Sequence, residues 1–272
     1  MTAPASTLTL VEKSVLVKPR GRISAGTHSL PFAFPLIGIG GEPLLETYRG
    51  KLVSVSYLLR VRIDRGIFSR TLEGTLEMAV KLRPERGSLG ICSSDASVRS
   101  GDDNGSGGGG GGGGVTPIRI NSTPESVAED TVAARSTVLP NFRIRGRLDR
   151  TVWALGGAVT GEVVVASSSL PTRSIDLRLV RIESVCRYEF DDGVDRTSFS
   201  AVKSEVETIQ IAEGDIPHGV PLPLYLPLPR LIVCPTVVRA AFKIEYVLEL
   251  MVFFVDGTVI TETYPVILYR AR

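Results

Sequence analysis

A proline-punctuated apolar segment followed by an alternating segment occurs twice in the sequence. The first copy spans residues 30–63 and the second spans residues 216–254. Pro31 corresponds to Pro221 and Tyr57 to Tyr246, at offsets of 190 and 189 positions. The shared order and nearly constant offset indicate one structural unit used twice, and such a repeat constrains the fold before any local pattern does.

Both tyrosine-centred segments alternate with a period of two. In the second copy the apolar side chains of one parity are Phe242, Ile244, Tyr246, Leu248, Leu250, Val252 and Phe254. In the first copy they are Val53, Val55, Tyr57, Leu59, Val61 and Ile63. This period predicts strands with one face on a core. Similar patterns predict strands at 71–82, 142–148, 161–166, 174–183, 203–211 and 259–269, and one or two short strands within 8–17.

The second half therefore has the strand spacing of a β-sandwich, whereas the first half is shorter. Before the repeated unit, the second half has about 75 residues, from Asn141 to Asp215, and the first half has 29. The sequence predicts an all-β protein of two tandem sandwiches, of which the N-terminal one lacks its first strands. We place the first sandwich at residues 1–88, a disordered Gly-rich loop at 89–114 and the second sandwich with its lead-in at 115–272. We expect Val53, Val55, Tyr57 and Leu59 to have incomplete cover on their apolar face.

Composition and motifs favour a binding protein. The net charge of +2 indicates no nucleic-acid partner, and no apolar run approaches the roughly 20 residues of a membrane span or resembles a secretory leader. Cys92, Cys186 and Cys234 form no metal-binding or disulfide pattern. His28 and His218 occupy corresponding turns of the two copies, which favours a structural role. No catalytic motif is present, so we expect no enzyme, cofactor or metal.

Three further features have two interpretations each. The arginines at 143, 145 and 147 lie on one parity of a strand and could bind phosphates, but a solvated strand face is favoured. The acidic residues at 189 and 191–195 favour a hairpin tip over a calcium site. Trp153 is interpreted as an anchor in the core or at its rim, and Ser122-Thr-Pro-Glu125 predicts the start of a short helix.

Several segments together resemble the arrestin-like vacuolar protein sorting 26 family. In the first half these are Leu16-Val-Lys-Pro19, residues 30–36 and Glu46-Thr-Tyr-Arg-Gly50; in the second they are residues 139–142, 145–148, 174–183, 209–215, 229–231 and 234–236. The chain is most similar to the branch called Down syndrome critical region protein 3, the arrestin-like subunit of retriever. The absent first strands and the expanded loop at 84–114 depart from the family pattern.

The resemblance implies a non-enzymatic coat subunit, cytoplasmic and peripheral on endosomes, that retrieves and recycles membrane-protein cargo. Its implied partners are an α-solenoid scaffold of the vacuolar protein sorting 35 type, a small phosphoesterase-like subunit of the vacuolar protein sorting 29 type held through that scaffold, and a sorting-nexin cargo adaptor. The membrane would be reached through the complex. An arrestin-domain adaptor that links cargo to a ubiquitin ligase is the alternative, against which the absence of any Pro-Pro pair counts. A metal-dependent β-sandwich enzyme is a weaker rival, because histidines are scarce and acids dispersed.

The scaffold-binding surface is predicted in the connection 209–219, between a charged strand and the second proline-rich segment. The candidate residues are Gln210, Ile211, Ala212, Glu213, Asp215 and Ile216. Two apolar side chains within a polar rim are typical of a protein interface. The resemblance independently implies the solenoid contact on this loop. The alternative is that Ile211 and Ile216 only close the end of their own sandwich.

We predict that deleting residues 101–114 leaves the melting temperature unchanged. This tract contains the eight consecutive glycines at 107–114 and offers no side chains that would pack. Shortening a flexible loop changes its closure free energy by only about 0.6 kcal/mol per halving. A fall of several degrees in differential scanning fluorimetry would contradict the prediction and show that the tract is docked.

Overall fold

The computed structural model describes residues 7–65, 70–82, 116–130, 139–191, 194–231 and 233–271. Cys92, the glycine tract and the predicted boundaries at 88 and 114 lie outside these residues, so the division into domains stays a prediction. The side chains of residues 187–197, which include the acidic cluster, also lie outside the description. The regular elements of the described chain are strands apart from one short helix and one 3-10 turn, which confirms the all-β prediction.

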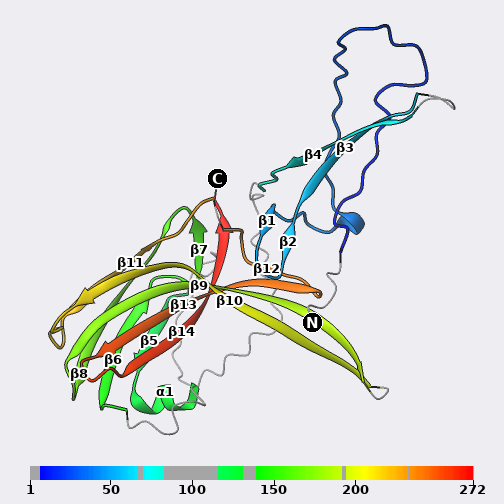
Figure 1. Ribbon diagram of the computed structural model, residues 1–272. Helices are drawn as coiled ribbons and strands as arrows, with labels where there is room; N and C mark the ends of the chain where they lie inside the picture. The colour runs from blue at the N-terminus through cyan, green and yellow to red at the C-terminus, as the bar shows by residue number, and fades with distance from the viewer. Residues whose placement is uncertain are drawn as a thin grey trace, which may run out of the picture.

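The second half forms a sandwich of two sheets (Figure 1). One sheet has six strands in the order β10-β9-β13-β14-β7, with β12 paired to β13, and the other has four in the order β11-β8-β6-β5. All neighbours are antiparallel except β14 and β7. The bounds are β5 (Ile118–Ser122), β6 (Phe142–Leu148), β7 (Val152–Leu155), β8 (Ala158–Ser168), β9 (Thr172–Asp191), β10 (Val194–Glu213), β11 (Pro221–Pro227), β12 (Val237–Val238), β13 (Phe242–Phe254) and β14 (Val259–Arg270).

The alternating apolar side chains of β13 form the centre of the core, as the sequence predicts. Tyr246 and Leu248 are at most 1% exposed, and the Phe254 ring lies 5.9 Å from the Phe142 ring of the opposite sheet. Trp153, on strand β7, is also in the core, at 5% exposure, in agreement with its interpretation as an anchor. Burying such apolar area, at about 25 cal/mol per Å², is the main force that holds the two sheets together.

A short helix, α1 (Pro124–Asp130), follows β5 as predicted. Proline at the first helical position suits a helix start because its missing N–H has no intrahelical acceptor there. The Thr123 hydroxyl accepts a hydrogen bond from the Ser126 amide at 3.4 Å, and the Thr123 amide donates to the Ser126 hydroxyl at 2.9 Å. Thr123 therefore supplies the cap immediately before Pro124.

The described part of the first half contains two strand pairs in place of a sandwich. These are β1 (Tyr48–Arg49) with β2 (Ser54–Val55), and β3 (Tyr57–Ile63) with β4 (Leu72–Met78), preceded by a 3-10 turn η1 (Ile39–Gly41). The strands predicted within 8–17 and in the first proline-rich segment are wrong, since the chain there is irregular. Its counterpart in the second half, β11, is a strand because it pairs with β8 along its whole length. Among the described residues, the first half offers no such partner.

The expectation that Val53, Val55, Tyr57 and Leu59 lack cover is wrong for the first three, which are 7%, 6% and 6% exposed and belong to the same core cluster as the second half. Leu59, the next residue of this parity, is half-buried. Further along, the hairpin β3–β4 projects away from the sandwich (Figure 1). There the large apolar side chains are exposed, with Leu58, Val61, Ile63, Leu72 and Leu76 between 46% and 62%. The first half is thus ordered where it touches the second.

A buried carboxylate joins the two halves. Glu183 lies on the core-facing parity of β9, and its side chain is fully buried. Its oxygens accept hydrogen bonds from the amides of Lys51, Leu52 and Val53 at 3.1, 2.7 and 3.0 Å and from the Tyr48 hydroxyl at 2.7 Å. Arg181 pairs with the same carboxylate at 3.2 Å. Burial alone would raise the pKa of Glu183, but these hydrogen bonds outweigh burial and hold it below its usual range.

A second buried carboxylate reinforces the junction. Glu46 receives both Nε and Nη2 of Arg270, at 2.6 and 2.8 Å, and the Leu82 amide at 3.2 Å. Arg270 also donates to the carbonyl oxygens of Arg230 and Val233. A bidentate arginine–carboxylate pair fixes orientation as well as distance. The start of the first half is therefore bound to the last strand of the second.

We predict that Glu183→Gln destabilises the protein by about 3–5 kcal/mol, the range for removing one partner of a buried ion pair. Because the folded-state pKa of Glu183 is lowered, its contribution is present above the unfolded-state pKa, about 4.3, and is lost as pH falls through the folded value. The stability gap between wild type and variant, measured by urea unfolding, should therefore shrink below that pH. A gap independent of pH would contradict this role of the charge.

Gly50→Ala tests the same contact from the other side. An added Cβ would lie 2.3–2.5 Å from the Glu183 carboxylate atoms, which five groups already hold in place. We expect a loss of unfolding free energy of about 2 kcal/mol, comparable to other overpacked sites. Gly74→Ala in β4 is the matched control, because nothing lies within 4 Å of its added Cβ. Equal unfolding midpoints for the two variants would show that Gly50 is not constrained.

Candidate partner-binding surface

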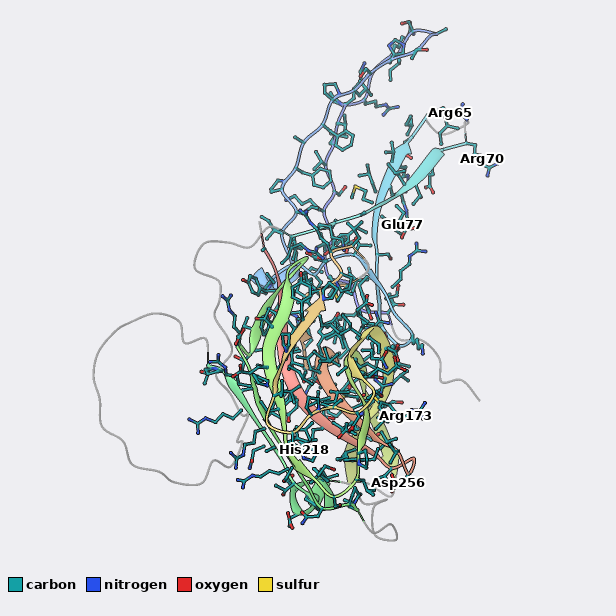
Figure 2. The ribbon with its side chains drawn as sticks, turned by 90° about the vertical axis from the view of Figure 1, so that its left-hand side faces the viewer. Arg65, Arg70, Glu77, Arg173, His218 and Asp256 are labelled. Atoms are coloured by element: carbon teal, nitrogen blue, oxygen red, sulfur yellow. The ribbon has the colours of Figure 1, made fainter. Side chains whose placement is uncertain are left out.

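The candidate surface lies at the end of β10, an edge strand of the six-stranded sheet. Residues 210–213 end the strand, and residues 214–220 connect it to β11. Gly214, at φ +91°, begins the connection, and its amide donates to the Arg173 carbonyl at 2.8 Å. Figure 2 shows Arg173 and His218 at the part of the sandwich away from the projecting hairpin. The surface is thus remote from the junction with the first half.

The predicted residues divide by burial into two groups. Gln210, Glu213 and Asp215 are exposed, and Ile211 and Ala212 are half-buried. Ile216 is only 5% exposed and belongs to the core, so it closes the end of its own sandwich. The interpretation as a plug holds for Ile216, whereas the other five residues remain accessible to a partner.

A β-bulge sets the direction of Ile211. Gln210 pairs with Asp176 and Ala212 with Ile175, and the register shifts between them, so Ile211 has no Cα partner in the ladder. A bulge bends the strand and re-aims a side chain, and such bulges are common on edges. The open side of an edge strand also presents unpaired backbone groups. The end of β10 therefore offers a free strand edge and a bulged aliphatic side chain that packs partly on the core and stays half-exposed.

Two carboxylates, Asp176 and Glu213, lie near Ile211, and the exposed Arg173 lies beside the connection. Asp176 lies opposite Gln210, and its Oδ1 atom is buried without a hydrogen-bond partner among the described residues. Burial raises the pKa of Asp176, and the negative charge of Glu213 raises it further. A cationic side chain brought to this place would pair with both carboxylates. The site is therefore suited to a partner that presents an apolar contact beside a basic one.

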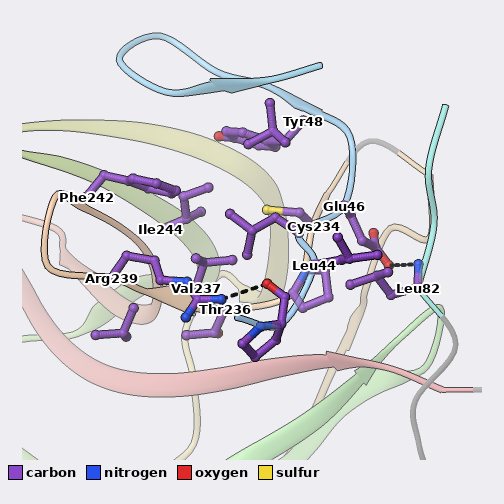
Figure 3. Close-up of a pocket in the computed structure, with 15 residues that line it drawn as sticks. Leu44, Glu46, Tyr48, Leu82, Cys234, Thr236, Val237, Arg239, Phe242 and Ile244 are labelled. Atoms are coloured by element: carbon purple, nitrogen blue, oxygen red, sulfur yellow. Dashed lines mark hydrogen bonds between the residues drawn. The ribbon is translucent and has the colours of Figure 1, made fainter. Parts of the chain in front are cut away.

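A cleft of about 250 Å³ lies at the junction, between residues 43–48 and 234–244 (Figure 3). Arg239 spans its rim, where it pairs with Glu42 at 2.5 Å and donates to the Pro43 carbonyl at 2.9 Å. Cys234 lines the cleft, with its Sγ 3.7 Å from the Tyr246 hydroxyl oxygen. Burial raises the pKa of this thiol, which therefore stays neutral and is a poor nucleophile. The cleft lies where the two halves meet, and its thiol is not a reactive group.

The family description "Vacuolar protein sorting-associated protein 26" matches residues 5–257 of the chain. The chain belongs to this family. It is 30% identical over 251 residues to "Vacuolar protein sorting-associated protein 26C" of Dictyostelium discoideum, a match that covers 92% of this chain and 73% of the relative. A solved sporulation control protein, Spo0M of Bacillus subtilis, aligns at TM-score 0.32 and 15% identity over 47% of this chain and 49% of that one, which is too distant to support an argument.

Membership of the Vps26 family confirms the resemblance seen in the sequence and, with it, an arrestin-like fold. It assigns the chain a role in vacuolar and endosomal protein sorting. Among the described residues, no group of three or more His, Cys, Asp or Glu side chains is arranged to hold a metal ion. No described helix has both the length and the apolar character needed to cross a membrane.

The sequence alone did not identify two acidic residues of this Vps26-family chain, Glu183 at the junction and Asp176 at the candidate surface. Ile175, Leu177 and Leu179 alternate inward on β9, and the same parity continues with Arg181 and Glu183. Charges that continue the buried parity of a strand indicate a buried ion pair that needs further partners. That pattern would have located Glu183. Asp176 has no such mark, because only the register of β10 shows that Glu213 lies near it.

We predict that Asp176→Asn raises the free energy of unfolding at pH 7 by about 0.5 kcal/mol, the scale of a surface charge interaction. The folded-state pKa is raised, so folding disfavours the ionised form, and the gain should vanish as pH falls below the unfolded value of about 3.9. Asp215→Asn is the control, because this exposed carboxylate has no ion pair in the described structure. Chemical denaturation at pH 7 and pH 3.5 measures both; a destabilised Asp176→Asn variant would contradict the unpartnered role of the carboxylate.

Proposed function

We propose that the chain is a non-enzymatic subunit of a retriever- or retromer-type endosomal coat. It binds an α-solenoid scaffold and supports retrieval and recycling of membrane-protein cargo, which a sorting-nexin adaptor delivers. A small phosphoesterase-like subunit is held through the same scaffold. Membership of the Vps26 family supports a sorting role, and the edge at the end of β10 supports a docking role.

The observation that carries the scaffold contact is the bulged Ile211 within an acidic rim. The contact surface consists of Gln210, Ile211, Ala212, Glu213 and Asp215, with Ile216 fixing the connection from inside. Apolar contacts surrounded by polar groups are the usual anatomy of an interface. The buried oxygen of Asp176, which has no donor among the described residues, supports a scaffold side chain that is basic.

Ile211→Asp should abolish scaffold capture. A charge at the centre of an interface costs a few kcal/mol of binding, which is a loss of more than about 100-fold in affinity. Because Ile211 is half-buried, we also expect a loss of about 1 kcal/mol in stability. Val238→Asp is the control, since Val238 is 62% exposed on β12, away from this end. The measurement is pull-down of a solenoid scaffold of the vacuolar protein sorting 35 type, with melting curves in parallel.

Glu213→Lys separates the interface from fold stability. Glu213 is exposed, and reversing its charge relieves the repulsion with Asp176, so the fold should not be weakened. A basic partner would be repelled, and we expect scaffold affinity to fall at least tenfold. If both variants capture the scaffold as well as the wild type does, the interface lies elsewhere on the protein. Recovery of a ubiquitin ligase in place of a solenoid scaffold would favour the adaptor alternative.

A further inference from the structure

The outer face of the four-stranded sheet carries a group of arginines that the scaffold contact does not use. Arg119 lies on β5 and Arg143, Arg145 and Arg147 lie on β6, and all four are exposed. The alternate residues of β6 point inward, with Phe142, Ile144 and Leu148 at most 2% exposed. We call these four residues the arginine face. The sequence pattern allowed two interpretations of the arginines on β6, a solvated strand face and a phosphate-binding surface.

The register of the sheet concentrates this charge. Arg119 is the direct cross-strand partner of Arg147, so two like charges lie opposite each other on adjacent strands. Such a pair destabilises a sheet unless an anion lies between the charges. Arg145 and Arg143 continue along β6, opposite Val164 and Ser167 of β8. Positive charge therefore covers an area of two strands and not a single line.

One carboxylate partly balances this charge. Glu162, on β8, pairs with Arg147 at 3.2 Å. Arg119, Arg143 and Arg145 form no ion pair with any described residue. Several arginines on other described surfaces have carboxylate partners, as in the pairs Arg49–Glu77, Arg62–Asp64, Arg178–Glu249 and Arg239–Glu42. Unpaired arginines also occur elsewhere, but on this face three of them lie together on two adjacent strands beside the paired Arg147.

An aromatic side chain completes the face. Tyr225 of β11 is 59% exposed, and Pro221 and Pro223 are exposed beside it. Pro223 is the cross-strand partner of Glu162 and Pro221 of Val164, so β11 borders the arginines through β8. Tyrosine is enriched where an apolar body meets a hydrated, charged layer. The face therefore combines phosphate-binding groups with an interfacial ring.

We propose that this face docks on an anionic membrane surface, with Arg119, Arg143, Arg145 and Arg147 bound to lipid phosphates and Tyr225 among the headgroups. A guanidinium binds phosphate through two parallel N–H donors. Peptides bind sheets at an edge or in a groove, whereas Arg143, Arg145 and Arg147 lie on β6, an interior strand whose backbone groups are already paired. The arginine face would recognise its partner through side-chain charges spread over an area. An array of lipid headgroups presents phosphates in the same way. The arginine face lies on the opposite sheet from β10, and the proposal does not depend on the scaffold contact.

The test is co-sedimentation of the full 272-residue chain with vesicles. Phosphatidylcholine vesicles with about 30 mol % phosphatidylserine are compared with pure phosphatidylcholine, since each arginine near an anionic surface contributes about fivefold in partitioning. The variant Arg119→Thr/Arg143→Thr/Arg145→Thr removes the unpaired charges while keeping a strand-favouring residue. We expect its binding to fall on the order of 100-fold, and binding of the wild type to weaken as salt screens the charges.

The control removes the same charge elsewhere. Arg20, Arg22 and Arg60 are exposed, form no ion pair with described residues and lie in the first half. Arg20→Thr/Arg22→Thr/Arg60→Thr should bind the anionic vesicles as the wild type does, and melting curves verify that both triple variants are folded. Equal losses in the two variants would reduce the effect to net charge and overturn the proposal. Wild-type protein that ignores anionic vesicles but binds a polyglutamate peptide through Arg119, Arg143 and Arg145 would make the face a protein-binding surface, which also overturns it.

Discussion

The two halves of this Vps26-family chain depend on one buried carboxylate. Glu183 receives three consecutive backbone amides, a tyrosine hydroxyl and an arginine. Without the carboxylate, the amides of residues 51–53 would lack this acceptor; without the first half, which supplies the amides and the Tyr48 hydroxyl, the charge of Glu183 would have only Arg181. Neither half can satisfy these groups alone. The contact therefore makes the order of the first half a consequence of the fold of the second.

The geometry of β9 explains why the junction lies where it does. At 20 residues, β9 is much longer than the 7-residue β6 and the 11-residue β8 of the opposite sheet. Part of its core-facing surface therefore extends beyond the cover of that sheet. Tyr48, Val53 and Val55 pack there, and the Arg181 guanidinium lies 5.3 Å from the centre of the Tyr48 ring. A short turn from the first half thus replaces a second sheet over the end of β9.

Much of the second half could be predicted from alternation, because its strands bury one face and pair along their length. β6 and β13 have the predicted bounds, and β14 differs by one residue. The structure of the first half was harder to predict. Its proline-rich segment repeats the composition of β11 but has no partner strand among the described residues, and strand formation depends on pairing that no local pattern reports.

The candidate site, too, could be predicted only in part from the sequence. Gln210, Glu213 and Asp215 are exposed, as a polar rim requires, whereas the burial of Ile216 depends on how the connection packs on the core and the proximity of Asp176 on the register of β9 and β10. Of the segments that carried the family resemblance, 46–50 and 174–183 touch at one contact, the hydrogen bond from Tyr48 to Glu183.

A net charge of +2 conceals a polarised second sandwich. The four-stranded sheet bears Arg119, Arg143 and Arg145, which have no carboxylate partner among the described residues, while the end of the six-stranded sheet and the connection after β10 bear Asp176, Glu213 and Asp215. Opposite charges on opposite sheets give each face its own field, because exposed charges separated by more than about 10 Å are largely screened from one another. The net charge therefore excludes a uniform attraction to polyanions, but it does not limit the local charge of a single face. A sandwich charged in this way can present its basic side to an anionic surface while its acidic edge stays free for a basic partner.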